Sequence, residues 1–151
     1  MPEEITAARS KRTVAQQLRI LLAQEGYRPT RATDEETPST IHFKVEGTTF
    51  VIRTNGEDPD FVAICTGYRL EETTKDELTL LRAAIEVQNE MKVAKVFVPR
   101  SLAFVEFQLE LFLGGNPLSA ELLERCIGTL RASRGQFFKL VTPQERPRAQ
   151  A

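Results

Sequence analysis

Histidine chemistry has one candidate in this sequence of 151 residues, because His42 is the only histidine. In the segment IHFKVEG, Ile41, Phe43 and Val45 alternate with polar residues, which is the two-residue period of a half-buried strand. His42 falls on the polar side of that alternation, beside Lys44. A metal site needs several ligands that converge at fixed spacing, and none is spaced to join His42. We therefore expect His42 to be an exposed strand residue.

Two groups of acidic residues could supply oxygen ligands or acid–base catalysis. The first, NGEDPD at residues 55–60, lacks the length and the distal glutamate of a calcium-binding loop. The second is Glu106 and Glu110, which share a strand face but are separated by ~13 Å at the rise of a β-strand. Two carboxylates that act together in catalysis are usually closer than this. We predict a turn at residues 55–60 and no catalytic carboxylate pair.

Motifs of the common enzyme classes are absent from the sequence, which has no G-x-S-x-G elbow, P-loop, G-x-G-x-x-G turn or kinase signature. We therefore predict no catalytic, cofactor-binding or metal-binding residues. The alternative is a small enzyme or ligand-binding protein whose site is assembled between sheet and helices from residues far apart in the chain. That alternative predicts a concave pocket with several converging polar groups.

Cys65 and Cys126 are the only cysteines, and they are far apart in the chain with no C-x-x-C spacing. Each lies among apolar neighbours at a position where a core residue is expected. We expect both to be reduced packing residues. A disulfide or a reactive thiol is the alternative.

One amide, Asn89, lies in the amphipathic segment AIEVQNEMKVAKVFV, just before the chain becomes an alternating strand. It follows Leu78 by eleven residues, or three helical turns, which places it on or beside the packed stripe of a helix. A buried amide without a partner costs about 1–3 kcal/mol. We therefore predict that Asn89 is a structural residue, bonded to the backbone between the helix end and the strand that begins at Val93. Contact with a ligand is the alternative.

These side chains belong to a chain with the composition of one globular domain, 41% hydrophobic and 27% charged. No apolar run approaches the roughly 20 residues that span a bilayer. The opening MPEEITAARSKR lacks the apolar stretch of a secretory signal. We expect a cytoplasmic protein with no membrane partner.

The net charge of −1 combines an acidic middle, residues 32–90, with two basic ends. We interpret this pattern as solvated surface whose charges intermix after folding; steering of a partner is the alternative. Nucleic-acid binding would require a larger basic excess with exposed aromatic residues beside it, so we expect no nucleic-acid partner.

Three helices are predicted from apolar stripes and capping residues. The first runs from Thr13 to Gln24, where Thr13 and Gln16 form a capping box. The second begins near Thr74, and the last follows Ser119 as its N-cap. The polar segment GYRPTRATDEETPST, with two prolines, is predicted to be a connector without an element.

Five strands are predicted from alternation and turn residues. Three lie in succession at residues 41–47, 48–54 and 61–68, and their short links favour an antiparallel meander. Two more lie at residues 93–99 and 102–114. In the last of these, Val105, Phe107, Leu109, Leu111 and Leu113 point to one face and Glu106, Gln108 and Glu110 to the other.

Two apolar surfaces are candidates for contact with a partner. The second predicted helix carries a stripe of Leu78, Leu81, Ile85 and Gln88, broadened by other apolar residues that include Val87 and Met91. A band this broad usually touches more than one surface, so a second subunit is expected there. Phe104 and Phe112 interrupt the polar face of the last strand at its two ends, where they would contact a partner or another element of the chain.

The predicted fold class is α+β, with an antiparallel five-stranded sheet and the order α-β-β-β-α-β-β-α. Residues 1–12 form an N-terminal extension, residues 13–141 a single domain, and residues 142–151 a flexible C-terminal tail.

This order of elements resembles the type III secretion chaperone-like fold. The segment AAIEVQNEMKVAKVFV, followed by FVEFQLEL and a closing helix that ends GQFFKL, resembles the YbjN family over residues 13–140, and Asn89 matches that family's asparagine at the end of the central helix. The resemblance implies a non-enzymatic, peptide-binding or chaperone-like module of bacterial origin, cytoplasmic and often dimeric, and it implies no catalytic residue or cofactor. The pI near 6.0 is less acidic than is usual for secretion chaperones, which favours the broader YbjN-like class.

The leading hypothesis is a protein-interaction module that binds polypeptide, by strand addition at a sheet edge or over an apolar patch, with a homodimer expected. Its candidate partner-binding residues are Val87, Met91, Phe104 and Phe112. Besides the ligand-binding alternative, a third hypothesis is a regulatory or structural subunit whose dimer surface is its purpose.

Overall fold

The structure of the protein is a computed structural model that describes residues 13–31, 40–70, 76–101 and 103–142. The predicted N-terminal extension lies outside the described residues, as does the predicted tail except Thr142. Within these ranges, three helices and six strands follow in the order α1 (Val14–Gln24), β1 (Thr30–Arg31), β2 (Thr40–Val45), β3 (Thr48–Thr54), β4 (Phe61–Arg69), α2 (Glu77–Glu90), β5 (Lys95–Phe97), β6 (Phe104–Phe112) and α3 (Ala120–Val141).

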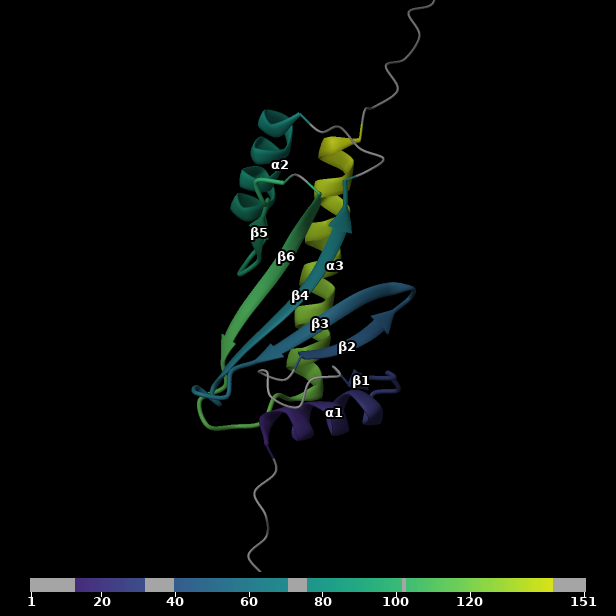
Figure 1. Ribbon diagram of the computed structural model, residues 1–151, viewed down its shortest axis with the longest axis vertical. Helices are drawn as coiled ribbons and strands as arrows, with labels where there is room; N and C mark the ends of the chain where they lie inside the picture. Colours follow the sequence, from purple (N-terminus) through teal and green to yellow (C-terminus); the bar gives the residue numbers. More distant parts are fainter. Residues whose placement is uncertain (1–12, 32–39, 71–75, 102, 143–151) are drawn as a thin grey trace, which may run out of the picture.

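All strands join one antiparallel sheet in the spatial order β1-β2-β3-β4-β6-β5 (Figure 1). The predicted α+β class and the five predicted strands are confirmed as β2 to β6. The prediction of a connector without an element is wrong at Thr30–Arg31, which forms the short edge strand β1. An edge strand of two residues needs backbone pairing but no apolar alternation, so the sequence gives no periodic signal for it.

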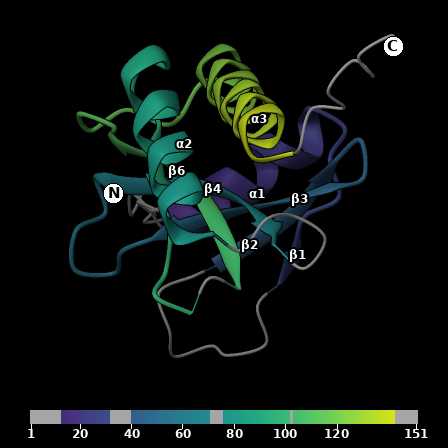
Figure 2. The same ribbon diagram turned by 90° about the horizontal axis from the view of Figure 1, so that it is seen from above.

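Helices α2 and α3 lie side by side on one face of the sheet (Figure 2), and α1 crosses one end of the molecule (Figure 1). We call the face beneath α2 and α3 the inner face and the opposite one the outer face. Alternate residues of the strands enclose the core at the inner face, including Phe43, Phe50 and Phe107. From α3, Phe137 packs on Phe107 with ring centroids 5.5 Å apart.

The helix ends follow from local sequence. Thr13 and Gln16 form the predicted capping box of α1, and the hydroxyl of Ser119 accepts a hydrogen bond from the Leu122 N–H at the start of α3. The prediction that α2 begins near Thr74 is wrong, because the helix begins at Glu77 with Asp76 as its N-cap; Thr74 lies outside the described residues.

The end of α1 is a Schellman turn. Gly26 has φ +87°, the Gly26 N–H donates to the Ala23 carbonyl, and the Tyr27 N–H donates to the Leu22 carbonyl. A residue with a Cβ is strained at this φ, so glycine allows the chain to reverse at once into β1. The turn fixes where Tyr27 and the residues after it lie against the edge of β2.

Candidate functional site

The outer face of the sheet is the surface on which the predicted polar and aromatic residues of β6 meet. Phe104, Glu106, Gln108, Glu110 and Phe112 alternate with the buried residues of the strand and project from this face. Because β6 lies between β4 and β5 in the sheet, side chains from both neighbours flank them.

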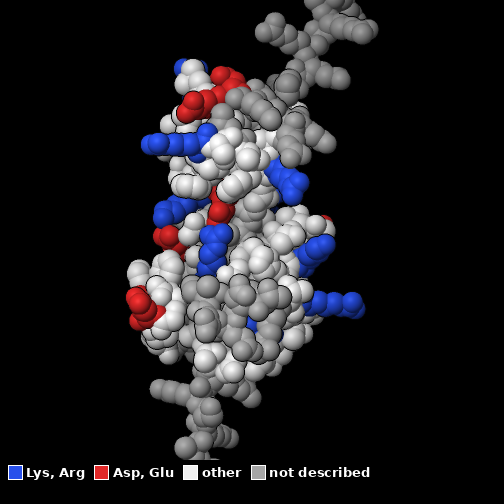
Figure 3. Space-filling model, viewed as in Figure 1, with Lys and Arg blue, Asp and Glu red and all other residues white. Residues whose placement is uncertain are grey.

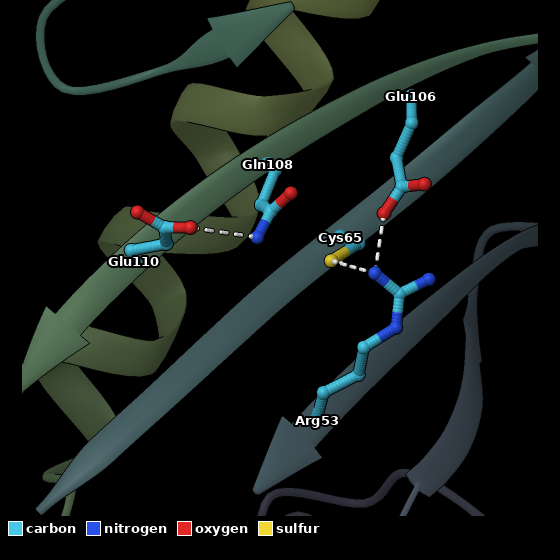
Figure 4. Close-up of polar contacts among 5 residues, drawn as sticks. All are labelled: Arg53, Cys65, Glu106, Gln108 and Glu110. Atoms are coloured by element: carbon cyan, nitrogen blue, oxygen red, sulfur yellow. Dashed lines mark hydrogen bonds and ion pairs between the residues drawn. The ribbon is translucent and has the colours of Figure 1, made fainter. Parts of the chain in front are cut away.

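The middle of the outer face is a group of paired polar side chains (Figure 4). The Arg53 guanidinium donates to the Glu106 carboxylate at 2.7 Å and to the Cys65 sulfur at 3.6 Å. The Gln108 amide donates to the Glu110 carboxylate at 3.1 Å. Outside the residues drawn there, Lys95 forms an ion pair with Glu110 at 3.0 Å. Each carboxylate is therefore neutralised by its own cation, as expected of a structural surface and not of a shared acid–base pair.

Cys65 lies at the base of this polar group and is buried, as is Cys126 in α3; both are free thiols. Burial raises the pKa of the Cys65 thiol to about 12, and the neighbouring Glu106 carboxylate adds to the rise. Burial also raises the pKa of Cys126. Both thiols are thus protonated at neutral pH, which confirms the expected packing role and makes nucleophilic chemistry unfavourable.

Each end of β6 carries a pair of aromatic side chains on the outer face, and all of them are exposed except Phe61, which is half-buried. At one end Phe112, 76% exposed, packs edge-on against Phe61 with centroids 5.8 Å apart. At the other end Phe104, 41% exposed, lies diagonal to Phe97 of β5, which is 57% exposed and pairs with Glu106. Sequence reasoning missed Phe97, although its alternation with Val96 was a usable signal. We call these two groups the aromatic pairs.

Figure 3 looks onto the outer face and shows acidic and basic side chains intermixed along its middle. Basic side chains also project from the side of the molecule where β1 to β3 lie. This intermixing agrees with the ion pairs of Arg53 and Lys95.

The exposed side of α2 differs from the one that the sequence suggested. Val87 is fully buried with Leu80, Ala83 and Ala84, so its prediction as a partner-binding residue is wrong; the inner face and α3 already cover it. Met91 is half-buried against the core. The exposed apolar side chains are instead those of a second stripe, between 41% and 57% exposed: Leu78, Leu81 and Ile85. We call these three residues the α2 stripe.

The amide that ties α2 to the sheet is Gln88 and not Asn89. The Gln88 side-chain oxygen accepts a hydrogen bond from the Val96 N–H at 3.3 Å, which joins the helix end to β5. Asn89 is exposed one position further along the helix, so the prediction of a buried structural amide at that position is wrong. The end of α2 does carry an amide that bonds to the sheet, but it is one position earlier. A shift of one residue turns a side chain by about 100° around the helix.

The remaining candidates have structural positions. His42 is exposed on the outer face of β2, and residues 55–60 form the predicted turn, in which Asn55 and Asp58 accept hydrogen bonds from the Glu57 and Asp60 N–H groups. Within the described ranges, no three or more His, Cys, Asp or Glu residues gather as metal ligands would. No described helix combines the length and apolar character needed to cross a bilayer.

Comparisons with known proteins find similarity in structure. No protein-family model matches the sequence, and no curated protein matches it. An uncharacterised protein from Methanothermobacter thermautotrophicus superposes with a TM-score of 0.66 at 14% identity, over 84% of this chain and 95% of the other.

Two further solved structures carry names. YbjN from E. coli, a putative transcription regulator, matches with a TM-score of 0.55 at 13% identity over 82% of this chain and 84% of the other. The complex of the Yersinia pestis type III secretion chaperone SycH with a fragment of YscM2 contains a match with a TM-score of 0.53 at 11% identity, over 85% and 99% of the two chains. At such identities the similarity concerns the fold alone.

Proposed function

We propose that this chain, which has the type III secretion chaperone-like fold with YbjN resemblance, is a non-enzymatic, cytoplasmic protein-interaction module that binds an extended polypeptide across the outer face. The observation that carries the proposal is the exposed aromatic pair at each end of β6. Large aromatic side chains dominate the energy of protein interfaces when a partner covers them. Between these aromatic residues, Glu106 and Glu110 are already paired with Arg53 and Lys95. Polar contacts there would fix the position of the bound chain without burying an unpaired charge.

The SycH structure supports the proposal, because that chaperone was solved in complex with a fragment of another protein, YscM2. The interior supports it by its composition, because the buried side chains among the described residues are apolar except Thr66 and Ser133. Both hydroxyls donate to backbone carbonyls, those of Thr49 and Thr129. The proposal therefore ranks above an enzyme or ligand site between sheet and helices.

The test is binding of the intact chain to a peptide array and to proteins captured from its native cell, repeated with Phe104→Ser and Phe112→Ser. Both residues are exposed, so the variants should keep the fold. Each is expected to weaken binding about tenfold or more, as for an interface residue that contributes about 1.4 kcal/mol.

The matched control is Phe138→Ser, which removes an exposed phenylalanine from α3, on the other side of the sheet. It should leave binding unchanged. Absence of any polypeptide ligand, together with unchanged behaviour of the Phe104 and Phe112 variants, would overturn the proposal.

The α2 stripe favours a second feature, a homodimer that pairs through α2. Leu78, Leu81 and Ile85 present apolar side chains to solvent along one side of the helix, away from the side where Glu90 bonds Gln136 of α3. A two-fold axis would let the same stripe of two copies cover each other. The outer face would remain free for polypeptide in this arrangement.

A further inference from the structure

A hollow of about 390 Å³ lies at the β1 edge of the sheet, between the turn that follows α1 and the strand β2. Pockets of about 300–1,000 Å³ are the size that holds small ligands or a few side chains. The lining includes apolar groups from Tyr27 and Phe43 and polar groups from Arg28, Thr30, His42 and Lys44.

The hollow exists because β1 is short. Thr30 and Arg31 pair with His42 and Ile41, and Pro29 stands where the pairing would continue toward Phe43. Proline has no N–H to donate to a strand. The chain therefore leaves the edge of β2 at this point, and the Schellman turn at Gly26 holds it apart.

The floor of the hollow is aromatic and fixed. The Tyr27 and Phe43 rings meet with centroids 5.3 Å apart. The Tyr27 hydroxyl donates to the Glu124 carboxylate at 2.7 Å, and burial together with this bond raises the pKa of Tyr27 to about 12. Tyr27 is thus neutral at physiological pH, and its hydrogen bond to Glu124 holds its ring in place on the floor of the hollow.

The rim of the hollow is cationic. Arg28 and Lys44 are exposed, and the ion pairs among the described residues engage neither of them. Of the carboxylates near this lining, Glu46 pairs with Arg131 and Glu124 with Tyr27. The exposed Glu25 lies close enough to Tyr27 to contribute to its raised pKa. A ligand with a negative charge and an apolar body would match this lining.

One row of the sheet leads from the outer face to the hollow. The register aligns five strands through Lys95, Gln108, Cys65, Val51 and His42, and Thr30 of β1 continues the row. Cys65 is buried in the middle of the row, beneath the Arg53 guanidinium that donates to its sulfur. From β5 to β2 the distance is about 19 Å at the usual strand spacing, which roughly six residues of extended chain would cover.

We propose that the hollow binds an acidic residue of the polypeptide that crosses the outer face, about six residues from an apolar residue held at the Phe97 and Phe104 pair. This inference rests on the proposed function and adds a sequence requirement to it. Arg28 and Lys44 bind the carboxylate, and the Tyr27 and Phe43 rings accept its aliphatic stem and a neighbouring apolar group.

The test uses the full chain and synthetic 15-residue peptides with one phenylalanine, a serine–glycine spacer of two, four, six or eight residues, and one glutamate. A matched set has glutamine in place of glutamate. We expect the tightest binding at a spacing near six and about tenfold weaker binding of the glutamine peptide, which corresponds to about 1.4 kcal/mol. High salt should reduce this difference, because the rim is exposed.

The double variant Arg28→Gln/Lys44→Gln should bind both peptides equally, at the affinity of the wild type for the glutamine peptide. Lys92→Gln/Arg125→Gln removes the same charge from two exposed positions elsewhere and should keep the preference for glutamate. Equal binding of the two peptides by the wild type, or a preference that survives the double variant, would overturn the inference and leave the proposed function standing. Failure of the wild type to bind any peptide is a different result, which overturns the proposed function and this inference with it.

Discussion

At the scale of single residues, the raised pKa of the Cys65 thiol predicts a loss of stability at alkaline pH. The folded protein holds the thiol proton up to a pKa of about 12, whereas a cysteine in an unfolded chain titrates near 8.5. Above about pH 8.5 the unfolded chain therefore loses the proton first, and stability falls as the pH rises toward 12. We expect a loss of about 2 kcal/mol from Cys65 between pH 8.5 and 10.5, measured by urea unfolding.

Cys65→Ala checks the origin of this loss. The variant should be somewhat less stable at pH 7, because it removes a buried sulfur, but its stability should depend less on pH above 8.5. Tyr27, whose pKa is also raised, contributes to alkaline loss in both proteins and cancels in the comparison. Identical pH profiles for the variant and the wild type would show that this thiol is not the group responsible.

At the scale of elements, the Gln88 side chain hydrogen-bonds α2 to β5. Gln88→Ala removes the acceptor of the Val96 N–H and should lower the free energy of unfolding by about 1 kcal/mol. Hydrogen exchange of the Val96 amide should become faster. Asn89→Ala is the matched control, since both amides are exposed but the hydrogen bond to Val96 comes from Gln88, and it should change stability by less than about 0.5 kcal/mol. A larger effect at Asn89 than at Gln88 would contradict this assignment.

Two glycines should respond in opposite directions to the same substitution. Gly26→Ala forces a Cβ into a φ of +87° and should destabilise the protein by about 1 kcal/mol. Gly128→Ala lies inside α3, where an added Cβ meets nothing within 4 Å, and should stabilise it by up to about 1 kcal/mol. Thermal unfolding of the two variants measures both effects, and a shift of the same sign would refute the explanation.

The elements could be predicted from the sequence where their causes are local. The capping box of Thr13, the N-cap Ser119 and the alternation of β6 each depend on residues within a few positions. The starts of α1 and α3, the faces of β6 and the exposure of Phe104 and Phe112 were therefore predictable. The buried side of α2 was not, because both of its apolar stripes have helical spacing and only the position of α3 decides between them. The hollow beside β1 was also unpredictable, since it depends on β2 and the α1 turn meeting in space.

At the scale of the whole molecule, the α2 stripe predicts association. Leu81→Glu/Ile85→Glu places two charges on the proposed dimer contact, where burial without partners is unfavourable. Light scattering at several concentrations should show twice the chain mass for the wild type. The variant should have a dimer dissociation constant at least about tenfold higher, so that it becomes monomeric at concentrations where the wild type is still a dimer. Leu122→Glu/Leu140→Glu changes two exposed leucines of α3 in the same way and should leave the mass unchanged. A wild type that is monomeric at every concentration would refute the dimer.

The two outermost strands of the sheet, β1 and β5, have only two and three residues. Long edge strands with unpaired backbone groups can pair with other chains and cause aggregation, and natural proteins limit this by keeping edge strands short. These two short strands therefore offer little edge of their own for another chain to pair with, although the sheet exposes phenylalanines on its outer face. Replacing Pro29 so that β1 can extend along β2 would lengthen this edge strand. The longer edge would make the protein more prone to aggregate.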